Sequence, residues 1–217
     1  MPGLTYVNSR FLYLKGPGPG YFENMEPVLP DWIKEPVARY LDLLDRWSRT
    51  HALTSLEKDQ RFEELILDSA ILLPFLANLP AGARVVDFGS GMGIPAIVLA
   101  LGRPDLTVYA LDKSHKKVAF VRQAALELAV ANLRPLAGRA EDLPPLGGQV
   151  GVAKAVGTLE LLMGWWDRHG EPGAPFLALK GPEPQVPPKG LQVAVHPYAL
   201  PTRGRRAVVE LRRAVSG

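Results

Sequence analysis

Apolar residues recur along this chain at helical and strand periods that predict its elements. From Pro36 to Trp47 they return every three to four positions, which predicts a helix. A second stripe with the same period predicts one helix over residues 60–79, followed at once by proline and glycine. Residues 1–30 are rich in glycine and proline and show no sustained period. We therefore expect an irregular arm, and then a helical extension over residues 31–80.

Beyond residue 80, short apolar runs alternate with helical patterns. Such alternation is typical of parallel strands joined by crossover helices. The expected strands lie at residues 85–86, 106–111, 133–137, 150–156 and 175–179, and the helices between them at 94–101, 114–128 and 158–167.

The alternation stops after Lys180. Residues 181–191 contain four prolines, which leave no room for a crossover helix. The last two apolar segments, residues 192–200 and 205–213, therefore predict an antiparallel hairpin. The expected fold class is α/β: a Rossmann-like, seven-stranded sheet over residues 81–217, parallel except for its C-terminal hairpin. This is the topology of seven-stranded methyltransferases.

A glycine-rich turn follows the first expected strand. Residues 84–95, RVVDFGSGMGIP, place Gly89, Gly91 and Gly93 in G-x-G-x-G spacing, with Asp87 two residues before the first glycine. Dinucleotide folds use G-x-G-x-x-G, and a pyrophosphate favours a helix N-terminus without added negative charge. Asp87 suits instead a ligand with an ammonium or a sulfonium, and S-adenosylmethionine carries both. Taken alone, the stretch also fits a tight strand-to-helix turn that binds nothing.

Two further strand ends supply partners for this ligand, because ligands of open α/β sheets lie outside the carboxyl ends of the strands. Asp112 ends the second strand, and its carboxylate suits two ribose hydroxyls, with a helix cap as its alternative role. The turn GRAED follows the third strand, and there the amide of Ala140 or Glu141, or the side chain of Glu141 or Asp142, suits an adenine edge. The expected contacts of S-adenosylmethionine are Asp87, Gly89, Ser90, Gly91, Gly93, Asp112, Lys113, Ala140 and Glu141.

The composition excludes several kinds of site. None of the 217 residues is cysteine, which excludes disulfides, zinc ribbons, iron–sulfur clusters and cysteine nucleophiles. We find no apolar run of about eighteen residues and no signal-peptide pattern, so we expect a cytoplasmic protein without membrane contact. A net charge of +3 permits a nucleic-acid partner without requiring one.

The segment after the fourth strand bears on the methyl acceptor. Amino-group methyltransferases generally carry Asn or Asp, two prolines and an aromatic residue there, which orient the exocyclic amine. This chain has Ala153, Lys154, Ala155 and Val156 instead. The difference favours an acceptor that is already nucleophilic. Guanine N7 is one, and it needs in-line placement rather than a general base.

Cationic side chains are the candidates for contact with RNA. Lys154 and Lys180 follow expected strands, where they suit phosphate or the O6 and N7 of guanine and so substrate positioning. Arg205 and Arg206 belong to a basic C-terminal cluster that suits phosphate. A solvated rim or face is the alternative for all four.

Other side chains carry weaker hypotheses. Trp165 and Trp166 are candidates to stack a base, but neighbours on a helix face different ways, so we expect at least one in the core. The four histidines have no metal-ligand spacing, and we expect no metal site.

Several blocks, in order, carry a resemblance to a known family. They are LLDRWSRTHALTSLEK, DFGSGMGIPAIVLA, LDKSHKKVAFVRQAALEL, GRAEDL, AKAVGTLELL, FLALKG and GRRAVVELRR. Over residues 39–213 the chain resembles the RsmG (GidB) family, the bacterial 16S rRNA guanine-N7 methyltransferases. The resemblance implies methyl transfer from S-adenosylmethionine to 16S ribosomal RNA or the small ribosomal subunit. It implies cofactor contacts at Gly89, Gly91, Gly93, Asp112, Ala140 and Glu141.

The chain departs from the family's pattern on the presumed substrate side. Where the family usually has two asparagines, a histidine and an arginine, this chain has Ser48, Ala52, Leu65 and Lys154. Lys180 and Arg206 match the pattern. The departures keep two alternatives open: a cofactor-binding RNA or ribosome-assembly protein with little catalysis, and a methyltransferase with another substrate. A nicotinamide-dependent oxidoreductase fits the glycine spacing poorly.

Overall fold

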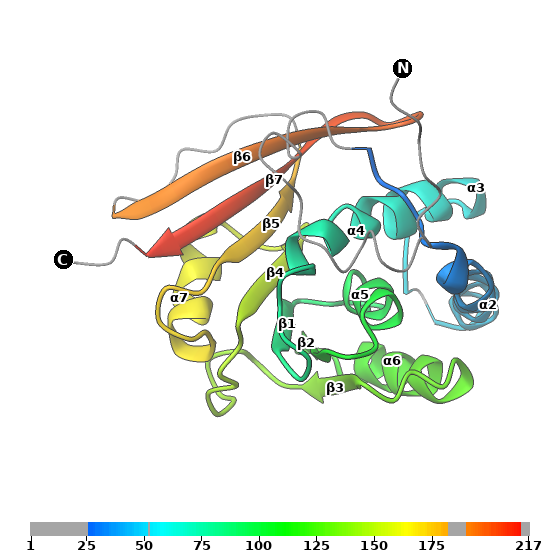
Figure 1. The fold of residues 1–217 in the computed structure, drawn as a ribbon. Helices are drawn as coiled ribbons and strands as arrows, with labels where there is room; N and C mark the ends of the chain where they lie inside the picture. Colours follow the sequence, from blue (N-terminus) through cyan, green and yellow to red (C-terminus); the bar gives the residue numbers. More distant parts are fainter. Residues whose placement is uncertain (1–25, 52, 182–189, 214–217) are drawn as a thin grey trace, which may run out of the picture.

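The computed structural model describes residues 26–51, 53–181 and 190–213, and these contain one sheet of seven strands (Figure 1). The strand order is β3-β2-β1-β4-β5-β7-β6. The strands are β1 (Arg84–Phe88), β2 (Thr107–Asp112), β3 (Leu133–Ala137), β4 (Val150–Lys154), β5 (Phe176–Lys180), β6 (Leu191–Leu200) and β7 (Gly204–Arg213).

The first five strands pair in parallel, and β7 pairs antiparallel with both β5 and β6. The predicted fold class, a parallel sheet with an antiparallel C-terminal hairpin, is confirmed. The chain runs outward from β1 to β3 and then returns to β4, on the other side of β1. The strand order therefore reverses between β1 and β4, where open α/β sheets bind ligands.

Helices cover both faces of the central part of the sheet, so that β1 and β4 are buried on both sides. Val85 of β1 joins the core beneath α5 (Ala96–Gly102) and α6 (His115–Glu127). Val86 and Phe88 join the core beneath α7 (Leu159–His169) on the opposite face. Figure 1 shows this arrangement, with α7 on one side of the sheet and α5 and α6 on the other. Successive side chains of β1 point to opposite faces of the sheet, and both faces are buried here. Apolar residues therefore follow one another along this strand.

The helical extension begins as predicted and then departs from the prediction. Helix α2 spans Asp31–Ser48. The single helix predicted over residues 60–79 is wrong, because this stretch is divided into four short segments: α3 (Lys58–Arg61), the π-helical η1 (Phe62–Leu67), α4 (Asp68–Ala70) and the 3-10 turn η2 (Leu73–Leu76). Pro74 lacks an N–H and so cannot continue an α-helix. The apolar stripe thus predicted which face is buried, but not the helical type.

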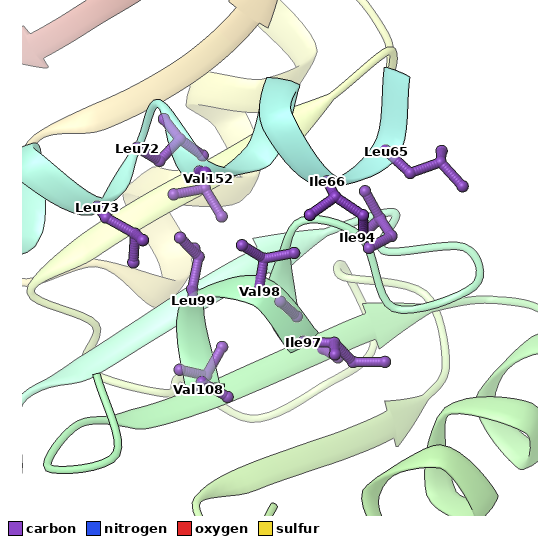
Figure 2. Close-up of a cluster of buried hydrophobic side chains, with 14 of the residues drawn as sticks. Leu65, Ile66, Leu72, Leu73, Ile94, Ile97, Val98, Leu99, Val108 and Val152 are labelled. Carbon is purple, nitrogen blue, oxygen red and sulfur yellow. The ribbon is translucent and has the colours of Figure 1, made fainter. Parts of the chain in front are cut away.

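The extension packs on α5 and shares the core of the sheet. Figure 2 shows Leu65, Ile66, Leu72 and Leu73 of the extension beside the side chains of α5. The approach is close, since a Cβ added at Gly102 would lie 2.5 Å from Leu73 Cδ2. One continuous core therefore crosses the expected boundary at residue 80. The division into an arm, an extension and a methyltransferase domain stays a prediction, and most of the arm lies outside the described residues.

A buried arginine ties the end of the extension to the sheet. Arg103, only 3% exposed, follows α5. Its guanidinium donates to the carbonyl oxygens of Leu76 and, at 3.0 Å, Leu79. It also binds both carboxylate oxygens of Asp105, at 2.8 and 2.7 Å. The charge is therefore neutralised, the Leu79 carbonyl gains a donor, and the Leu76 carbonyl gains a second one beside the N–H of Leu79.

No helix among the described residues has the length and apolar character needed to cross a membrane.

Replacing Arg103 by methionine should lower the free energy of unfolding by about 3 kcal/mol, because the Leu79 carbonyl and the Asp105 carboxylate lose the guanidinium donor and the Leu76 carbonyl loses one of its two donors. Urea unfolding measures this. The matched control is Arg49→Met, since Arg49 is 77% exposed and lies 4.0 Å from Asp45. That change should stay within about 0.5 kcal/mol. Equal effects of the two substitutions would contradict the role given to Arg103.

Candidate functional site

A cavity of about 780 Å³ opens at the carboxyl ends of β1, β2 and β4. Its size is that of a site for a small organic molecule. The glycine turn after β1 and the turn after β3 form part of its wall, and Thr54, Leu56, Glu64 and Leu65 of the extension form another part. It lies where the strand order reverses, which the topology alone predicts. The extension therefore helps to build the site in addition to covering the sheet.

The three glycines of the turn after β1 meet different structural requirements. All have positive φ, +69° at Gly89, +58° at Gly91 and +91° at Gly93, a conformation that favours glycine. A Cβ at Gly89 would lie 2.6 Å from Val156, and one at Gly93 would lie 2.8 Å from Ile97. At Gly91 the nearest atom would be 4.0 Å away, so its backbone borders open space. Gly89 and Gly91 line the cavity, whereas Gly93 lies outside its lining and serves packing.

Asp112 joins the glycine turn to the next helix. Its Oδ2 accepts the N–H of Gly91 at 2.9 Å, and its Oδ1 accepts the N–H of Ser114, the residue before α6, at 2.8 Å. The side chain also lines the cavity. Because each carboxylate oxygen has a second lone pair, the structural bonds leave acceptor capacity for a ligand. The predicted ribose role and the alternative capping role are therefore compatible. Lys113, next in the chain, is exposed and also lines the cavity.

The turn after β3 brings the second predicted group of ligand contacts to the same cavity. Both Ala140 and Glu141 line it. The indole N–H of Trp165 donates to Glu141 Oε1 at 2.7 Å. The nearby backbone N–H of Glu141 and the hydrogen bond from the Trp165 indole lower the pKa of Glu141. Glu141 is therefore held as an anion beside the cavity.

Asp87 is fully buried and lies outside the cavity lining. Its Oδ2 accepts the N–H of Ala96, the first residue of α5, at 3.1 Å, so that it caps this helix. Burial raises its pKa well above the ordinary value. Ser90 Oγ is also buried, without a partner among the described residues, and Ser90 lines the cavity. The expected contact of Asp87 with a ligand stays a prediction.

The two predicted lysines are not brought together. Lys154 lines the cavity, and its ammonium forms an ion pair with Asp68, which also accepts the hydroxyl of Tyr198 at 2.5 Å. Lys180 lies outside the cavity lining, and its ammonium donates to the carbonyl of Gly157 at 3.0 Å. Burial lowers the pKa of Lys180. Lys154 thus lines the cavity while paired with a carboxylate of the extension. Sequence spacing did not reveal this ion pair.

The C-terminal arginines also differ from each other. Arg206 lies 3.4 Å from the carboxylate of Glu64, which Arg203 also contacts at 3.4 Å. Arg205 is exposed. Their expected contact with RNA stays a prediction, and the pairing of Arg206 with a cavity-lining carboxylate was missed because the two residues are far apart in the sequence.

The tryptophans divide as expected, one into the core and one elsewhere. Trp166 is 3% exposed and packs against Phe176. Trp165 lines the cavity and stacks on Phe88 with ring centroids 5.9 Å apart. Its stacking on a base stays a prediction. Within the described part of the chain, no group of acidic residues and histidines is arranged to hold a metal ion.

The departures from the family's pattern fall at different distances from the site. Leu65 and Lys154 line the cavity. Ser48 ends α2 and lies outside the lining. Ala52 lies outside the described residues.

Asp87→Asn should change how stability depends on pH. The folded protein keeps the Asp87 proton over a range in which the unfolded chain, with its ordinary pKa of 3.8, has lost it. The stabilisation from this proton is present at low pH and is lost as pH rises toward the raised pKa. Wild-type unfolding free energy should therefore fall relative to Asp87→Asn as pH rises above 3.8, by at most about 1.4 kcal/mol per pH unit. Urea unfolding at a series of pH values tests this, and a constant difference would contradict it.

Comparison with known structures supports the fold. An S-adenosylmethionine-dependent methyltransferase from Aquifex aeolicus has a TM-score of 0.53 at 18% identity, covering 70% of this chain and 92% of its own. An O-methyltransferase from Bacillus cereus, in complex with S-adenosylhomocysteine, has a TM-score of 0.58 at 12% identity, covering 86% and 93%. At such identities the likeness shows the fold alone.

Comparison with sequences identifies the family. A protein named ribosomal RNA small subunit methyltransferase G from Yersinia enterocolitica is 37% identical over 163 residues, covering 72% of this chain and 75% of its own. One with the same name from Bordetella avium is 32% identical over 191 residues, covering 83% and 85%. The model of the GidB family, described as rRNA small subunit methyltransferase G, matches residues 33–191. With most of its length matched by the family model and by these relatives, the chain belongs to the rRNA small subunit methyltransferase G (GidB) family.

Proposed function

We propose that this protein transfers a methyl group from S-adenosylmethionine to N7 of a guanine in 16S ribosomal RNA. Its family membership makes it an S-adenosylmethionine-dependent methyltransferase. The relatives are named for the small-subunit ribosomal RNA, and we extend that substrate to this chain. The observation that carries the proposal is a single cavity shared by the glycine turn, Asp112 and the extension.

The described residues fit this cofactor. Gly91 leaves the cavity floor free of a side chain, and Asp112 keeps lone pairs for ribose hydroxyls. The anionic Glu141 adjoins them in the same cavity. When bound, S-adenosylmethionine supplies an electrophilic methyl group on a sulfonium. We assign its binding to Gly89, Ser90, Gly91, Asp112, Lys113, Ala140 and Glu141, all of which line the cavity.

The acceptor side of the cavity supports a target that needs no general base. Among the described residues, the acidic side chains that line the cavity are Glu64, Asp112 and Glu141. Each already has a partner: arginines for Glu64, backbone amides for Asp112 and an indole N–H for Glu141. Guanine N7 has an exposed lone pair and needs only to be held in line with the methyl group, with water excluded.

Apolar side chains in the cavity wall can pack against a flat base. Leu56, Leu65, Ile94, Val156 and Leu161 all line it. Leu65 replaces the histidine usual in the family, so the wall is more apolar here. We therefore propose that the base is held mainly by contact with these side chains, which suit the faces of an extruded nucleobase.

Cations beside the cavity are suited to the RNA backbone. Lys113, Lys117 and Arg139 line the cavity. Arg205 is exposed on β7. We propose that these four contact phosphates, and that Lys154, Lys180 and Arg206 join them on leaving the Asp68, Gly157 and Glu64 oxygens that they now bind. A ribosomal RNA substrate also favours a cytoplasmic location.

One observation favours the alternative of a cofactor-binding assembly protein with little catalysis. Lys154 and Arg206, which stand at arginine positions of the family's pattern, are both engaged by carboxylates of the extension, Asp68 and Glu64. If these ion pairs persist when RNA binds, neither cation is available to the acceptor.

Mapping the modification decides between these functions. Incubation of the protein with labelled S-adenosylmethionine and small ribosomal subunits, from cells lacking the gene, should label one guanine at N7. Chemical cleavage at N7-methylguanine followed by primer extension locates it. Methylation at an exocyclic amine or a ribose would contradict the N7 proposal. Tight cofactor binding without turnover on any small-subunit RNA would support the assembly protein.

Asp112→Ala should weaken S-adenosylmethionine binding by about 1 to 3 kcal/mol, or about 5- to 150-fold in Kd, because ribose hydroxyls lose a buried acceptor. Calorimetry measures the Kd, and circular dichroism checks the fold, since Asp112 also binds the amides of Gly91 and Ser114. Glu160→Ala is the control, since Glu160 is an exposed acidic residue outside the cavity lining. An unchanged Kd for Asp112→Ala would refute the ribose assignment.

A further inference from the structure

A buried histidine lies directly behind the turn after β3. His169 is the last residue of α7 and is 0% exposed. Its Nε2 lies 2.7 Å from the carbonyl oxygen of Ala140, and its Nδ1 is buried without a partner among the described residues. Because a carbonyl oxygen only accepts, Nε2 carries the proton of this hydrogen bond. The ring also packs edge-on against Phe88, with centroids 5.6 Å apart.

Helix α7 holds the turn at three points. His169 binds the Ala140 carbonyl, Trp165 binds the Glu141 carboxylate, and Arg168 Nε donates to the carbonyl of Leu143 at 2.9 Å. The spacing of three and four residues places these side chains on neighbouring parts of one helix surface. Within the turn, the one backbone bond between its residues runs from the N–H of Asp142 to Arg139, at 3.1 Å. The position of the turn is therefore set largely from outside, by α7.

Peptide geometry links His169 to the cavity. In a trans peptide the carbonyl of one residue and the N–H of the next point in opposite directions. With the Ala140 carbonyl held by His169 in the core, the N–H of Glu141 points away from that side. This N–H lies beside the Glu141 carboxylate, whose Oε1 is held by the indole of Trp165. Glu141 thus offers a donor beside an acceptor where it lines the cavity.

This pair of groups is complementary to one edge of adenine. Adenine N1 accepts a hydrogen bond, and its exocyclic N6 amine donates one. An N–H beside a carboxylate therefore matches N1 and N6 together, whereas hypoxanthine, with N1–H and a 6-oxo group, reverses both roles. The match requires that the Ala140–Glu141 peptide keep its orientation, and the sole side-chain bond to that peptide's carbonyl comes from His169.

We infer that His169 is a positioning residue for S-adenosylmethionine: through the Ala140 carbonyl it orients the peptide whose N–H, with the Glu141 carboxylate, recognises the adenine edge. The inference rests on cofactor binding and is independent of the RNA acceptor. Helix α7 thereby gains a role in selecting the nucleoside, and the sequence did not reveal this role.

Three substitutions separate positioning from packing. His169→Phe keeps a ring against Phe88 and removes the donor. His169→Gln places an amide nitrogen the same number of bonds from Cα as Nε2, so it can donate to Ala140. His169→Asn places its amide nitrogen at the position of Nδ1 instead. His196→Phe is the control, since this half-buried histidine lies outside the cavity lining.

The experiment compares two ligands by calorimetry, S-adenosylhomocysteine and S-inosylhomocysteine, on the full chain. Wild type should prefer the adenosine compound. His169→Phe and His169→Asn should lose about tenfold or more of that preference, because a misplaced peptide cannot distinguish the two edges. His169→Gln and His196→Phe should retain it. Thermal unfolding without ligand reports any packing defect separately.

The outcomes are distinct. If His169→Phe weakens both ligands equally, or leaves the preference unchanged, the positioning role is overturned. If wild type binds neither ligand, the cofactor assignment itself fails. Should His169→Phe not fold, Trp165→Phe provides the second test, because it keeps a ring beside Phe88 and removes the indole N–H from Glu141. It should lose the preference by a similar factor, and an unchanged preference would overturn the inference.

Discussion

The site depends on the carboxylate of Asp112, which holds together two loops that the sheet brings side by side. One oxygen binds the amide of Gly91 and the other binds the amide of Ser114. The β1 loop can approach because it carries glycines at positive φ, one of them pressed against Val156. Parallel pairing of β1 with β2 places Asp87 opposite Ala110 and so sets the level at which both strands end. A ligand in this cavity meets loops that are already in place, which reduces the cost of binding.

The extension is joined to the end of β4 and to the terminal hairpin by paired charges. Asp68 engages Lys154 and Tyr198, and Glu64 engages Arg203 and Arg206. These contacts join three parts of the chain, the extension, the end of β4 and the terminal hairpin, around one cavity. Buried or half-buried carboxylates of this kind are tolerated because each has a cationic or hydroxyl partner. The part of the cavity wall that we propose for the substrate is therefore held by long-range ion pairs, whereas the part that we propose for the cofactor is held by local loops and backbone amides.

Sequence patterns were most informative where local chemistry dominates. The glycine turn, Asp112 and the turn after β3 were found from strand ends and spacing, and the structure brings them to one cavity. The patterns were least informative over residues 60–79, where the apolar period hid a π-helical segment and a proline-limited 3-10 turn. The predicted contact of Asp87 with a ligand stays a prediction, and its carboxylate caps α5 from within the core. Spacing showed that an acid was present and could not show where its oxygens point.

The sequence by itself determined the succession of strands and helices along the chain beyond residue 80 and the hairpin after the proline-rich segment. It also determined the cofactor and the protein family. These depend on the period of apolar residues, on turn residues and on ordered motifs. Only the tertiary structure decided which charges meet. Lys154 and Asp68 are 86 residues apart, and His169 and Ala140 are 29 apart. Such contacts follow from which faces of the sheet and helices are buried together, and a linear pattern does not encode the direction of a side chain across a packed interface.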